Sequence, residues 1–568
     1  MNTLRHKRFG RIAACTALAL AAGPVFAGPA AAGPVVPPKP PEARQELRTP
    51  LPTGSLPTAR REALTARGPL APARFDVNGD GNNDLLYRTL GNSYLLKTFA
   101  QEDKQVTVPA GEPGETLRDV VPVGNTTGSA QPEVLTLSTT GKLSLYQVEK
   151  GGSFTSQGWS GRGWTVYNKV VGPGDLTGDG KPDLLARTPG GELYLYPGTG
   201  AGYGAAPFGA RVRIGAGWGA YDQLVAVGDT DGDGHGDLVA RTPGGALYHY
   251  AGTGSRTAPF RAKVQVGSGW QIYNQLFSLG DGEVLGRDLA GTVWLYVPLG
   301  DGRLAPRKQF GTRWQYTTLF SGQGGTSAHG KYQLIARDTA NTLYEYTGRM
   351  NGAFFPREKA SSDGGWPDHA PIVFASSVTS AGYGSFLYVF QGHLYNGDSH
   401  VGGGWDIYNH VTGVGDLSGD GIGDLVARDR AGVLWLYRST GTGSTFATRV
   451  RIGAGWGGFD RLFGAGDLTG DGRADLIART TGGTLYVYPG TGNASAPFAA
   501  KVKIGTGFHI YGKLASPGDI TGDGRADLIG VDSAGKAYRY SATGLGGMST
   551  LSGRSLLGGG WNIYKGLH

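Results

Sequence analysis

The strongest chemical signal in the sequence is a short acidic loop that recurs six times. Each copy follows the pattern Asp-x-(Asp/Asn/Ser/Thr)-x-Asp-Gly-x-x-Asp. Side-chain oxygens at positions 1, 3, 5 and 9 converge on one centre when such a loop curls, and position 7 can add its backbone carbonyl. The candidate ligands are Asp76, Asn78, Asp80, Asn82 and Asp84; Asp175, Thr177, Asp179, Lys181 and Asp183; Asp229, Asp231, Asp233, His235 and Asp237; Asp416, Ser418, Asp420, Ile422 and Asp424; Asp467, Thr469, Asp471, Arg473 and Asp475; and Asp519, Thr521, Asp523, Arg525 and Asp527.

A ligand set made only of oxygen atoms favours Ca²⁺ over zinc or copper. The loops are not EF-hands, because they lack a glutamate at position 12 and are followed by a strand-like run such as Leu238-Val239-Ala240-Arg241. Aspartate and glycine also favour ordinary turns, so purely acidic turns are the alternative. Carboxylates this close would repel one another without a cation, and we therefore expect bound Ca²⁺ with a structural role.

A second recurring element, Gly-Trp-x-x-(Tyr/Phe), carries aromatic side chains next to glycine and an amide or carboxylate. An aromatic face with a polar neighbour can form a carbohydrate site. The candidates are Trp164, Tyr167, Trp218, Tyr221, Trp270, Tyr273, Trp405, Tyr408, Trp456 and Trp561. A tryptophan at the same place in every unit can equally pack one unit against the next, and the sequence favours packing over ligand contact.

These motifs belong to a repeat of about 50 residues that occurs ten times after residue 75. Each unit holds four short β-prone runs separated by turns, which predicts an all-β fold of the β-propeller type rather than a β-solenoid. The first unit lacks the Trp-Tyr strand that introduces most other units, and the chain ends on such a strand, Trp561–Lys565. We expect two five-bladed rings, 75–320 and 332–568, joined by a linker at 321–331, with one larger ring as the alternative.

Composition excludes several other classes of protein. Glycine supplies 101 of 568 residues, but no Gly-X-Y period indicates collagen, and 39% hydrophobic residues argue against disorder of the whole chain. A single cysteine rules out a disulfide scaffold. Residues 1–74 hold 11 of the 53 basic and 3 of the 45 acidic side chains, which leaves 42 of each sign in the remainder. The formal charge of +8 therefore lies in residues 1–74, and the remaining residues carry no excess of positive charge that would indicate nucleic-acid binding.

The N-terminus is typical of an exported protein. Residues 1–27 read as a signal peptide, with a basic start, a short apolar core and a small-x-small cleavage site at Val25-Phe26-Ala27. Cys15 lies too early in this segment for a lipoprotein signal. Residues 28–74 are rich in Pro, Ala and Arg and are expected to form a disordered linker. We therefore predict a secreted protein, and no later segment is apolar enough to cross a membrane.

Motifs of common hydrolases and nucleotide-binding enzymes are missing. The sequence has no Gly-x-Ser-x-Gly elbow, no His-Glu-x-x-His, no P-loop and no cysteine–histidine cluster. We expect no enzymatic activity, although a hydrolase with dispersed catalytic residues is an alternative.

The six acidic loops resemble the FG-GAP/VCBS repeats of integrin α-subunit propellers and of many secreted bacterial proteins. The Gly-Trp-x-x-(Tyr/Phe) element and the blade length more weakly resemble tachylectin-2-type lectins, and there is a further similarity to the propeller lectin subunits of bacterial umbrella toxin particles. The resemblance implies a calcium-stabilised propeller that binds glycans or cell-wall polymer multivalently, as a lectin or adhesin. The alternative is a protein-interaction propeller that acts as a subunit of a secreted assembly.

Overall fold

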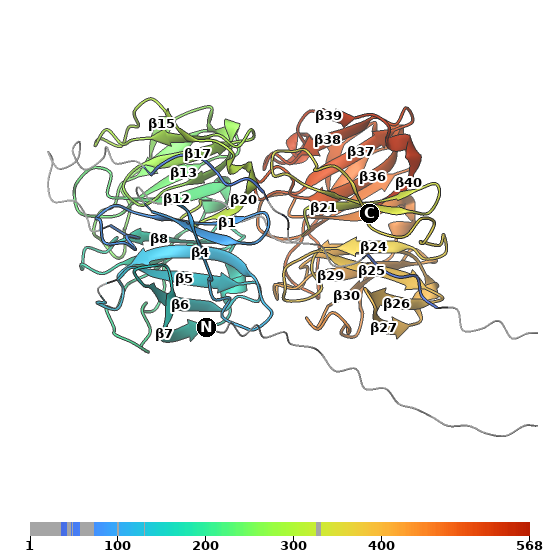
Figure 1. Ribbon diagram of the computed structural model, residues 1–568, viewed down its shortest axis with the longest axis horizontal. Helices are drawn as coiled ribbons and strands as arrows, with labels where there is room; N and C mark the ends of the chain where they lie inside the picture. The colour runs from blue at the N-terminus through green and yellow to red at the C-terminus, as the bar shows by residue number, and fades with distance from the viewer. Residues whose placement is uncertain are drawn as a thin grey trace, which may run out of the picture. The chain divides into compact units, whose positions relative to one another are not determined.

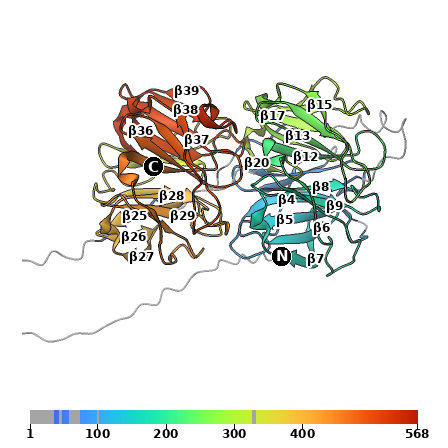
Figure 2. The same cartoon turned by 180° about the vertical axis from the view of Figure 1, so that it is seen from behind.

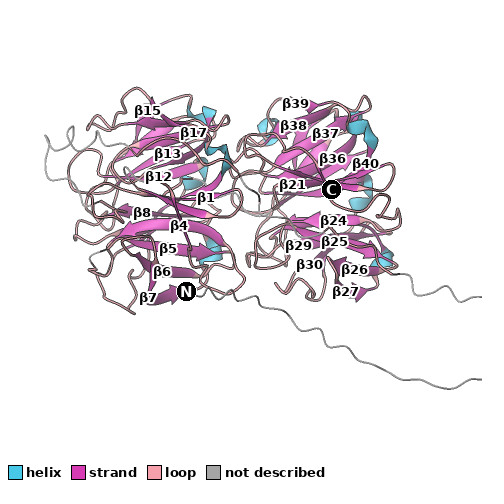
Figure 3. Cartoon of the chain, in the orientation of Figure 1, coloured by secondary structure: helices cyan, strands magenta, loops and turns pink. Residues whose placement is uncertain are grey.

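The computed structural model describes residues 36–41, 47, 49–56, 73–98, 102–129, 131–324 and 331–568. These residues form ten four-stranded antiparallel sheets connected by turns and by short 3₁₀ helices (Figure 3). The predicted signal peptide and most of the predicted linker lie outside the described residues. The all-β propeller fold expected from the repeat is confirmed.

The first five sheets are the blades of one ring, and the strands of each blade are named from the innermost to the outermost. They are β20 (Thr317–Phe320), β1 (Leu85–Thr89), β2 (Tyr94–Lys97) and β3 (Lys104–Val106); β4 (Leu117–Gly124), β5 (Glu133–Ser138), β6 (Leu143–Val148) and β7 (Phe154–Gly161); β8 (Lys169–Gly174), β9 (Asp183–Arg187), β10 (Leu193–Tyr196) and β11 (Val212–Gly215); β12 (Gln223–Gly228), β13 (Asp237–Arg241), β14 (Leu247–Tyr250) and β15 (Val264–Gly267); and β16 (Tyr273–Phe277), β17 (Val284–Asp288), β18 (Val293–Tyr296) and β19 (Lys308–Gly311).

The other five sheets form the second ring in the same manner. They are β40 (Tyr564–Leu567), β21 (Gln333–Asp338), β22 (Leu343–Thr347) and β23 (Glu358–Lys359); β24 (Ile372–Ala375), β25 (Ser385–Phe390), β26 (His393–Asn396) and β27 (Ser399–Gly403); β28 (Tyr408–Gly415), β29 (Asp424–Asp429), β30 (Leu434–Tyr437) and β31 (Val450–Gly453); β32 (Phe459–Gly466), β33 (Asp475–Thr480), β34 (Leu485–Tyr488) and β35 (Val502–Gly505); and β36 (Tyr511–Gly518), β37 (Asp527–Asp532), β38 (Ala537–Ser541) and β39 (Ser555–Gly558). Figures 1 and 2 show the blue-to-green strands and the yellow-to-red strands as two separate groups.

Each ring is closed by its own last strand. β20 pairs with β1 through Tyr87 and Phe320, and β40 pairs with β21 through Ala336 and Leu567. One hydrophobic cluster joins the fifth blade to the first, and another joins the tenth to the sixth. Pairing the last strand with the first blade removes the open sheet edges that would otherwise be exposed.

A short 3₁₀ turn carrying the recurrent tryptophan precedes the inner strand in most blades. These turns are η1 (Trp164–Val166), η2 (Trp218–Ala220), η3 (Trp270–Ile272), η4 (Trp314–Tyr316), η5 (Trp405–Ile407), η6 (Trp456–Gly458), η7 (Phe508–Ile510) and η9 (Trp561–Ile563), with η8 (Gly547–Ser549) elsewhere. Gly217 precedes η2 with φ 88°, a left-handed conformation that glycine adopts without steric cost. Trp218 N donates to Gly191 O of the preceding blade, so the turn fixes adjacent blades together. We refer to the end of each ring that carries these turns as its Trp-turn face.

Two segments differ from the sequence-based expectation of loose linkers. In the N-terminal segment, Leu56 is buried, Thr53 N donates to Thr312 O, and Trp314 Nε1 donates to Thr53 O. Residues 321–324 also pack against the first ring, because Leu224 N donates to Gly324 O and Gln323 is buried. Apolar and hydrogen-bonding groups therefore hold these pieces of the predicted linkers on the folded body. Among the described residues, no helix has the length and apolar character needed to span a membrane.

Candidate metal-binding loops and ring faces

Each acidic loop precedes the second strand of its blade, and in five of the six blades it connects the inner strand to that strand. The loops are organised around their first and last aspartates. In the loop after β8, the Asp175 carboxylate accepts hydrogen bonds from Gly178 N at 2.7 Å and Gly180 N at 2.7 Å. The Asp183 carboxylate accepts from Leu176 N at 2.8 Å and Gly198 N at 2.8 Å. Gly178 and Gly180 have φ of 75° and 79°, which allows the loop to curl. The first aspartate bonds to the position-4 and position-6 amides in all six loops.

The carboxylates that close the loops are crowded and buried. In four of them burial has the largest effect on the pKa, while backbone hydrogen bonds act in the opposite direction. Burial raises the pKa of Asp183 to about 6, of Asp84 and Asp475 to about 7, and of Asp424 to about 8. Neighbouring carboxylates contribute to these raised pKa values, so a cation bound among them would relieve their mutual repulsion.

Several oxygen atoms in the loops are suited to a cation. The hydroxyls of Thr177 and Thr469 at position 3 are buried without a hydrogen-bond partner, as are the Oδ1 atoms of Asp84 and Asp527. Asp229, Asp231 and Asp237 each offer one carboxylate oxygen within 4.8 Å of the others. The residue types, spacing and orphaned oxygens fit a hard divalent cation such as Ca²⁺.

The backbone N–H at position 7 has the same partner in every loop. It donates to the position-5 carboxylate, as His235 N does to Asp233 at 3.0 Å and Ile422 N does to Asp420 at 2.9 Å. The position-7 side chains take separate roles, since Arg525 pairs with Asp523 at 2.7 Å and Lys181 lies 3.8 Å from Asp179.

Two blades without the acidic pattern keep its architecture with glutamate. Thr126 N donates to Glu133 at 2.7 Å in the second blade, and Leu279 N donates to Glu283 at 2.6 Å in the fifth. Both glutamates are buried. A longer side chain thus makes the backbone contact that the closing aspartate makes elsewhere. In the sequence, Glu133 aligns without gaps with the closing aspartate at position 9 of the acidic loops, and this alignment indicated its role.

The raised pKa values predict how pH acts on the calcium-free protein. A folded-state pKa above the unfolded value contributes stability that is full below the unfolded pKa and is lost as pH rises through the folded pKa. The shifts of Asp183, Asp84, Asp475 and Asp424 place this loss between about pH 4 and pH 8. We expect the Tm in EGTA to fall from pH 5 to pH 8, as measured by scanning calorimetry. Asp424→Asn, which mimics the protonated acid, should flatten the trend, and a Tm that rises over this range would contradict the prediction.

Three loops of the second ring contact the Trp-turn face of the first ring. Asn168 Nδ2 donates to Asp471 O at 2.7 Å, and Asn274 Nδ2 donates to Thr521 O at 2.6 Å. Arg525 Nη1 lies 3.2 Å from the Asp222 carboxylate, and the glycine-rich bend at Gly421 lies against Thr139. We call this contact the ring junction. It covers loops that the sequence alone could not distinguish from the exposed loops of the first ring.

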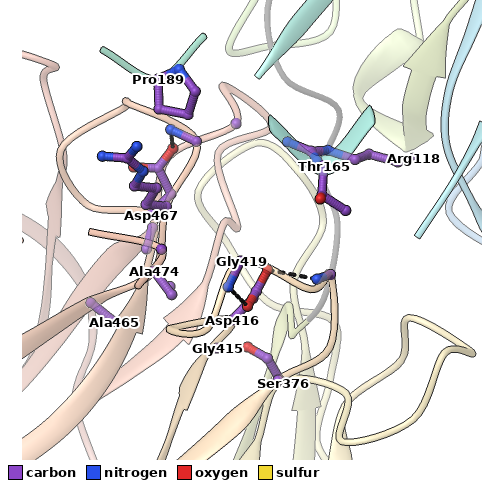
Figure 4. A pocket seen from close by; sticks show the side chains of 18 of the residues that line it. Arg118, Thr165, Pro189, Ser376, Gly415, Asp416, Gly419, Ala465, Asp467 and Ala474 are labelled. Atoms are coloured by element: carbon purple, nitrogen blue, oxygen red, sulfur yellow. Dashed lines mark hydrogen bonds between the residues drawn. The ribbon is translucent and has the colours of Figure 1, made fainter. Parts of the chain in front are cut away.

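A cavity of about 750 Å³ lies at the ring junction. Asp416 and Asp467 of the second ring and Arg118 and Thr165 of the first ring line it, and Figure 4 shows them from close by. Burial lowers the pKa of Arg118, while the carboxylates of Asp416, Asp119 and Asp467 oppose that effect. A basic side chain of the first ring and two acidic side chains of the second ring therefore line the same cavity.

The predicted aromatic ligand residues lie between blades. All the tryptophans proposed for carbohydrate contact (Trp164, Trp218, Trp270, Trp405, Trp456 and Trp561) are buried. Trp218 packs on Tyr250 with ring centroids 4.8 Å apart, and the Tyr221 hydroxyl bonds to that of Tyr250 at 2.6 Å. Tyr167, Tyr273 and Tyr408 make the same kind of hydroxyl pair. These contacts support the packing role that the sequence favoured for the aromatic element.

The turns instead expose a residue that the motif did not single out. The second residue after the tryptophan or phenylalanine is an exposed aliphatic side chain in five turns: Val166, Ile272, Ile407, Ile510 and Ile563. A polar residue stands next to it in each case, such as Asp406 before Ile407 and Asn562 before Ile563. The recurrence of Val or Ile at this position was the available sequence signal.

A basic side chain also stacks on an outer aromatic ring in seven blades. Arg307 lies 4.2 Å from the centroid of Trp294, and Arg449 lies 4.2 Å from that of Trp435. The other pairs are Arg211–Tyr194, Lys263–Tyr248, Arg357–Tyr344, Lys501–Tyr486 and Arg554–Tyr538. Each cation covers a ring face, which leaves that face unavailable to a sugar.

Comparison with known families places the acidic loops in one of them. Residues 175–240, 416–478 and 467–530 match the FG-GAP-like repeat family. The chain carries FG-GAP-like repeats. The matched segments contain every acidic loop except the first, Asp76–Asp84. No curated protein is significantly similar to the chain in sequence.

Two solved structures are similar at low identity. The BP39L lectin from Burkholderia pseudomallei is 12% identical, with a TM-score of 0.24, covering 69% of this chain and 100% of the lectin. Sqt1 from Saccharomyces cerevisiae is 11% identical, with a TM-score of 0.20, covering 78% of this chain and 97% of Sqt1. Likenesses this weak do not bear on the ligand of this protein.

Proposed function

We propose that this protein is a secreted, calcium-stabilised propeller that binds glycans through repeated shallow sites. The observation that carries the proposal is the recurrent turn that buries its tryptophan and exposes a Val or Ile beside a polar side chain. An aliphatic surface can cover the apolar C–H face of a sugar, while the neighbouring amide or carboxylate binds its hydroxyls. Several equivalent sites on one rigid ring would gain affinity through multivalency.

Calcium has a structural role in this proposal. The first and last aspartates of each loop already fix the backbone, so a bound Ca²⁺ would complete the loop and hold two strands of the blade together. Binding to the folded state alone stabilises it by RT ln(1 + [Ca²⁺]/Kd) per site.

A glycan array in calcium tests the proposed function, with a triple variant as the sharper probe. Ile407→Asp, Ile510→Asp and Ile563→Asp place charges on the exposed side chains of three turns in the second ring. We expect the combined variant to lose about tenfold or more in apparent affinity for an array-positive glycan, because loss of several sites removes avidity. Leu556→Asp, at an exposed apolar position on the outer strand β39, is the matched control. No array signal in calcium would refute glycan binding.

Protein binding is the second candidate function. The ring junction supports it, because there the acidic-loop face of one ring docks on a protein surface through backbone carbonyls and an Arg525–Asp222 ion pair. The first ring carries three acidic loops of the same type. Affinity capture from culture medium with wild-type protein and with an Asp179→Ala/Asp233→Ala variant tests this alternative, and retention of the same partners by both proteins would count against it.

A further inference from the structure

The inner strands of the second ring place basic residues at one level of its channel. His410, Arg461 and Lys513 are the third residues of β28, β32 and β36, strands of three consecutive blades. His410 pairs in register with Arg428, and Arg461 pairs with Arg479. We refer to the end of the channel carrying Arg461 and Lys513 as the basic mouth.

Hydrogen bonds between neighbouring blades bring these residues together around the mouth. His410 Nε2 bonds to Leu462 O at 2.6 Å on β32, and Arg461 Nη2 donates to Gly512 O at 3.2 Å on β36. Each of the two side chains therefore reaches across to the next inner strand. Since Leu462 follows Arg461 and Gly512 precedes Lys513, these contacts connect the three residues in sequence around the channel.

The positive charge at the basic mouth is not balanced by a carboxylate. The nearby Arg428, on β29 and directed between two blades, donates to Asn409 Oδ1 at 2.9 Å and to the carbonyls of Trp456 and Phe459, all of which are neutral acceptors. Within the described part of the chain, Arg461 and Lys513 form no ion pair. Burial lowers the pKa of His410 to about 4, which leaves its imidazole uncharged at neutral pH, so Arg461 and Lys513 supply the net charge of the mouth.

In the first ring, the side chains at the same positions are buried and covered by another segment of the chain. Lys169, Gln223 and Gln275 occupy the equivalent level and are 4%, 1% and 3% exposed. Residues 321–324 cover them, with Lys169 bonding to Gln323 O and lying 3.6 Å from Asp119. In the second ring, Arg461 is exposed and Lys513 half-exposed, and no described segment caps them. The basic mouth is therefore open to solvent.

We propose that the basic mouth binds an anionic group of a glycan: a carboxylate, sulfate or phosphate. Guanidinium and ammonium groups form charge-assisted hydrogen bonds with all three anions. Ile407 and Ile510, three residues before His410 and Lys513, expose apolar side chains on turns leading into the mouth, where a sugar ring attached to the anion can lie. The inference rests on the proposed glycan-binding function and narrows it to acidic glycans.

Calorimetric titration of the full-length protein in calcium tests the inference. The probes are a sulfated heparin hexasaccharide, a hexagalacturonate, a glycerol-phosphate hexamer and neutral N-acetylchitohexaose. Comparing them distinguishes binding of sulfate, carboxylate and phosphate from binding of an uncharged sugar. The variant is Arg461→Gln/Lys513→Gln, whose changed side chains are solvent-accessible and leave the fold intact by circular dichroism. Lys536→Gln, an exposed lysine on a hairpin near the Trp561 turn, is the matched control.

We expect at least one anionic oligosaccharide to bind about tenfold more tightly than the neutral one and to lose that advantage in the double variant but not in the control. Equal binding of neutral and anionic probes, or anionic binding unaffected by the double variant, would overturn the inference while leaving glycan binding in place. If no oligosaccharide binds, inorganic sulfate, which stays soluble at millimolar calcium, decides. Binding to wild type but not to the double variant retains the anion site without the glycan function, and no binding refutes both.

Discussion

Replacing Asp222 by alanine should destabilise the protein by about 3–5 kcal/mol, because it leaves the buried Arg241 without its carboxylate partner and removes one of the two carboxylates that Arg525 contacts. The Asp222 carboxylate lies 2.6 Å from Arg241 of its own blade and 3.2 Å from Arg525 of the second ring. Side chains of all three residues are nearly inaccessible to solvent. Although burial opposes it, the two guanidiniums hold the pKa of Asp222 below its usual value. Urea unfolding in saturating calcium measures the loss.

The repeat supplies a matched control for this substitution. Asp460 occupies the position of Asp222 in the second ring and pairs with Arg479 at 2.6 Å, but it is about one-third exposed and has no partner from another ring. Asp460→Ala should therefore cost only about 1–2 kcal/mol. A double-mutant cycle between Asp222 and Arg525 isolates the contribution of the ring junction. Equal losses at Asp222 and Asp460 would show that the contact between rings adds nothing.

Removal of calcium should lower the Tm by several degrees. At a calcium concentration 100 times its Kd, each occupied loop raises the free energy of unfolding by about 2.7 kcal/mol. Chelation removes that contribution. Calorimetry with and without EGTA, with metal content verified by mass spectrometry, measures the change. An unchanged melting curve after complete metal removal would contradict a structural role for the loops.

Variants in a single loop should show how much one loop of each ring contributes to the stability that calcium provides. Asp471→Ala and Asp179→Ala remove the position-5 carboxylate from one loop each and should weaken one blade without unfolding the whole protein. We expect the larger loss for Asp471→Ala, because the Asp471 loop is held at the ring junction by Asn168 whereas Asp179 is exposed. Adding calcium back after chelation should restore the Tm of the wild type fully and the Tm of each variant only in part. Identical losses would show that the junction does not depend on the loop.

Much of the fold could be predicted because it is encoded locally. The alternation of short strands and turns predicts four-stranded blades, and the isolated Trp314–Phe320 and Trp561–Lys565 segments predict which strands close each ring. The acidic loops were visible for the same reason, since all their candidate side-chain ligands lie within nine residues. The burial of the tryptophans also followed from their regular recurrence.

What the tertiary structure decided depends on residues far apart in the chain. Asp222 and Arg525 are separated by 303 positions, and no pattern in a single sequence marks them as partners. The same holds for the capping of Lys169 by Gln323 in the first ring and the open cations Arg461 and Lys513 in the second. The sequence by itself determined the blades, their closure and the acidic loops, because those contacts repeat within about 50 residues. Which loops are covered and which channel mouth stays open was decided by how two similar rings dock, because one repeat pattern is compatible with several such arrangements.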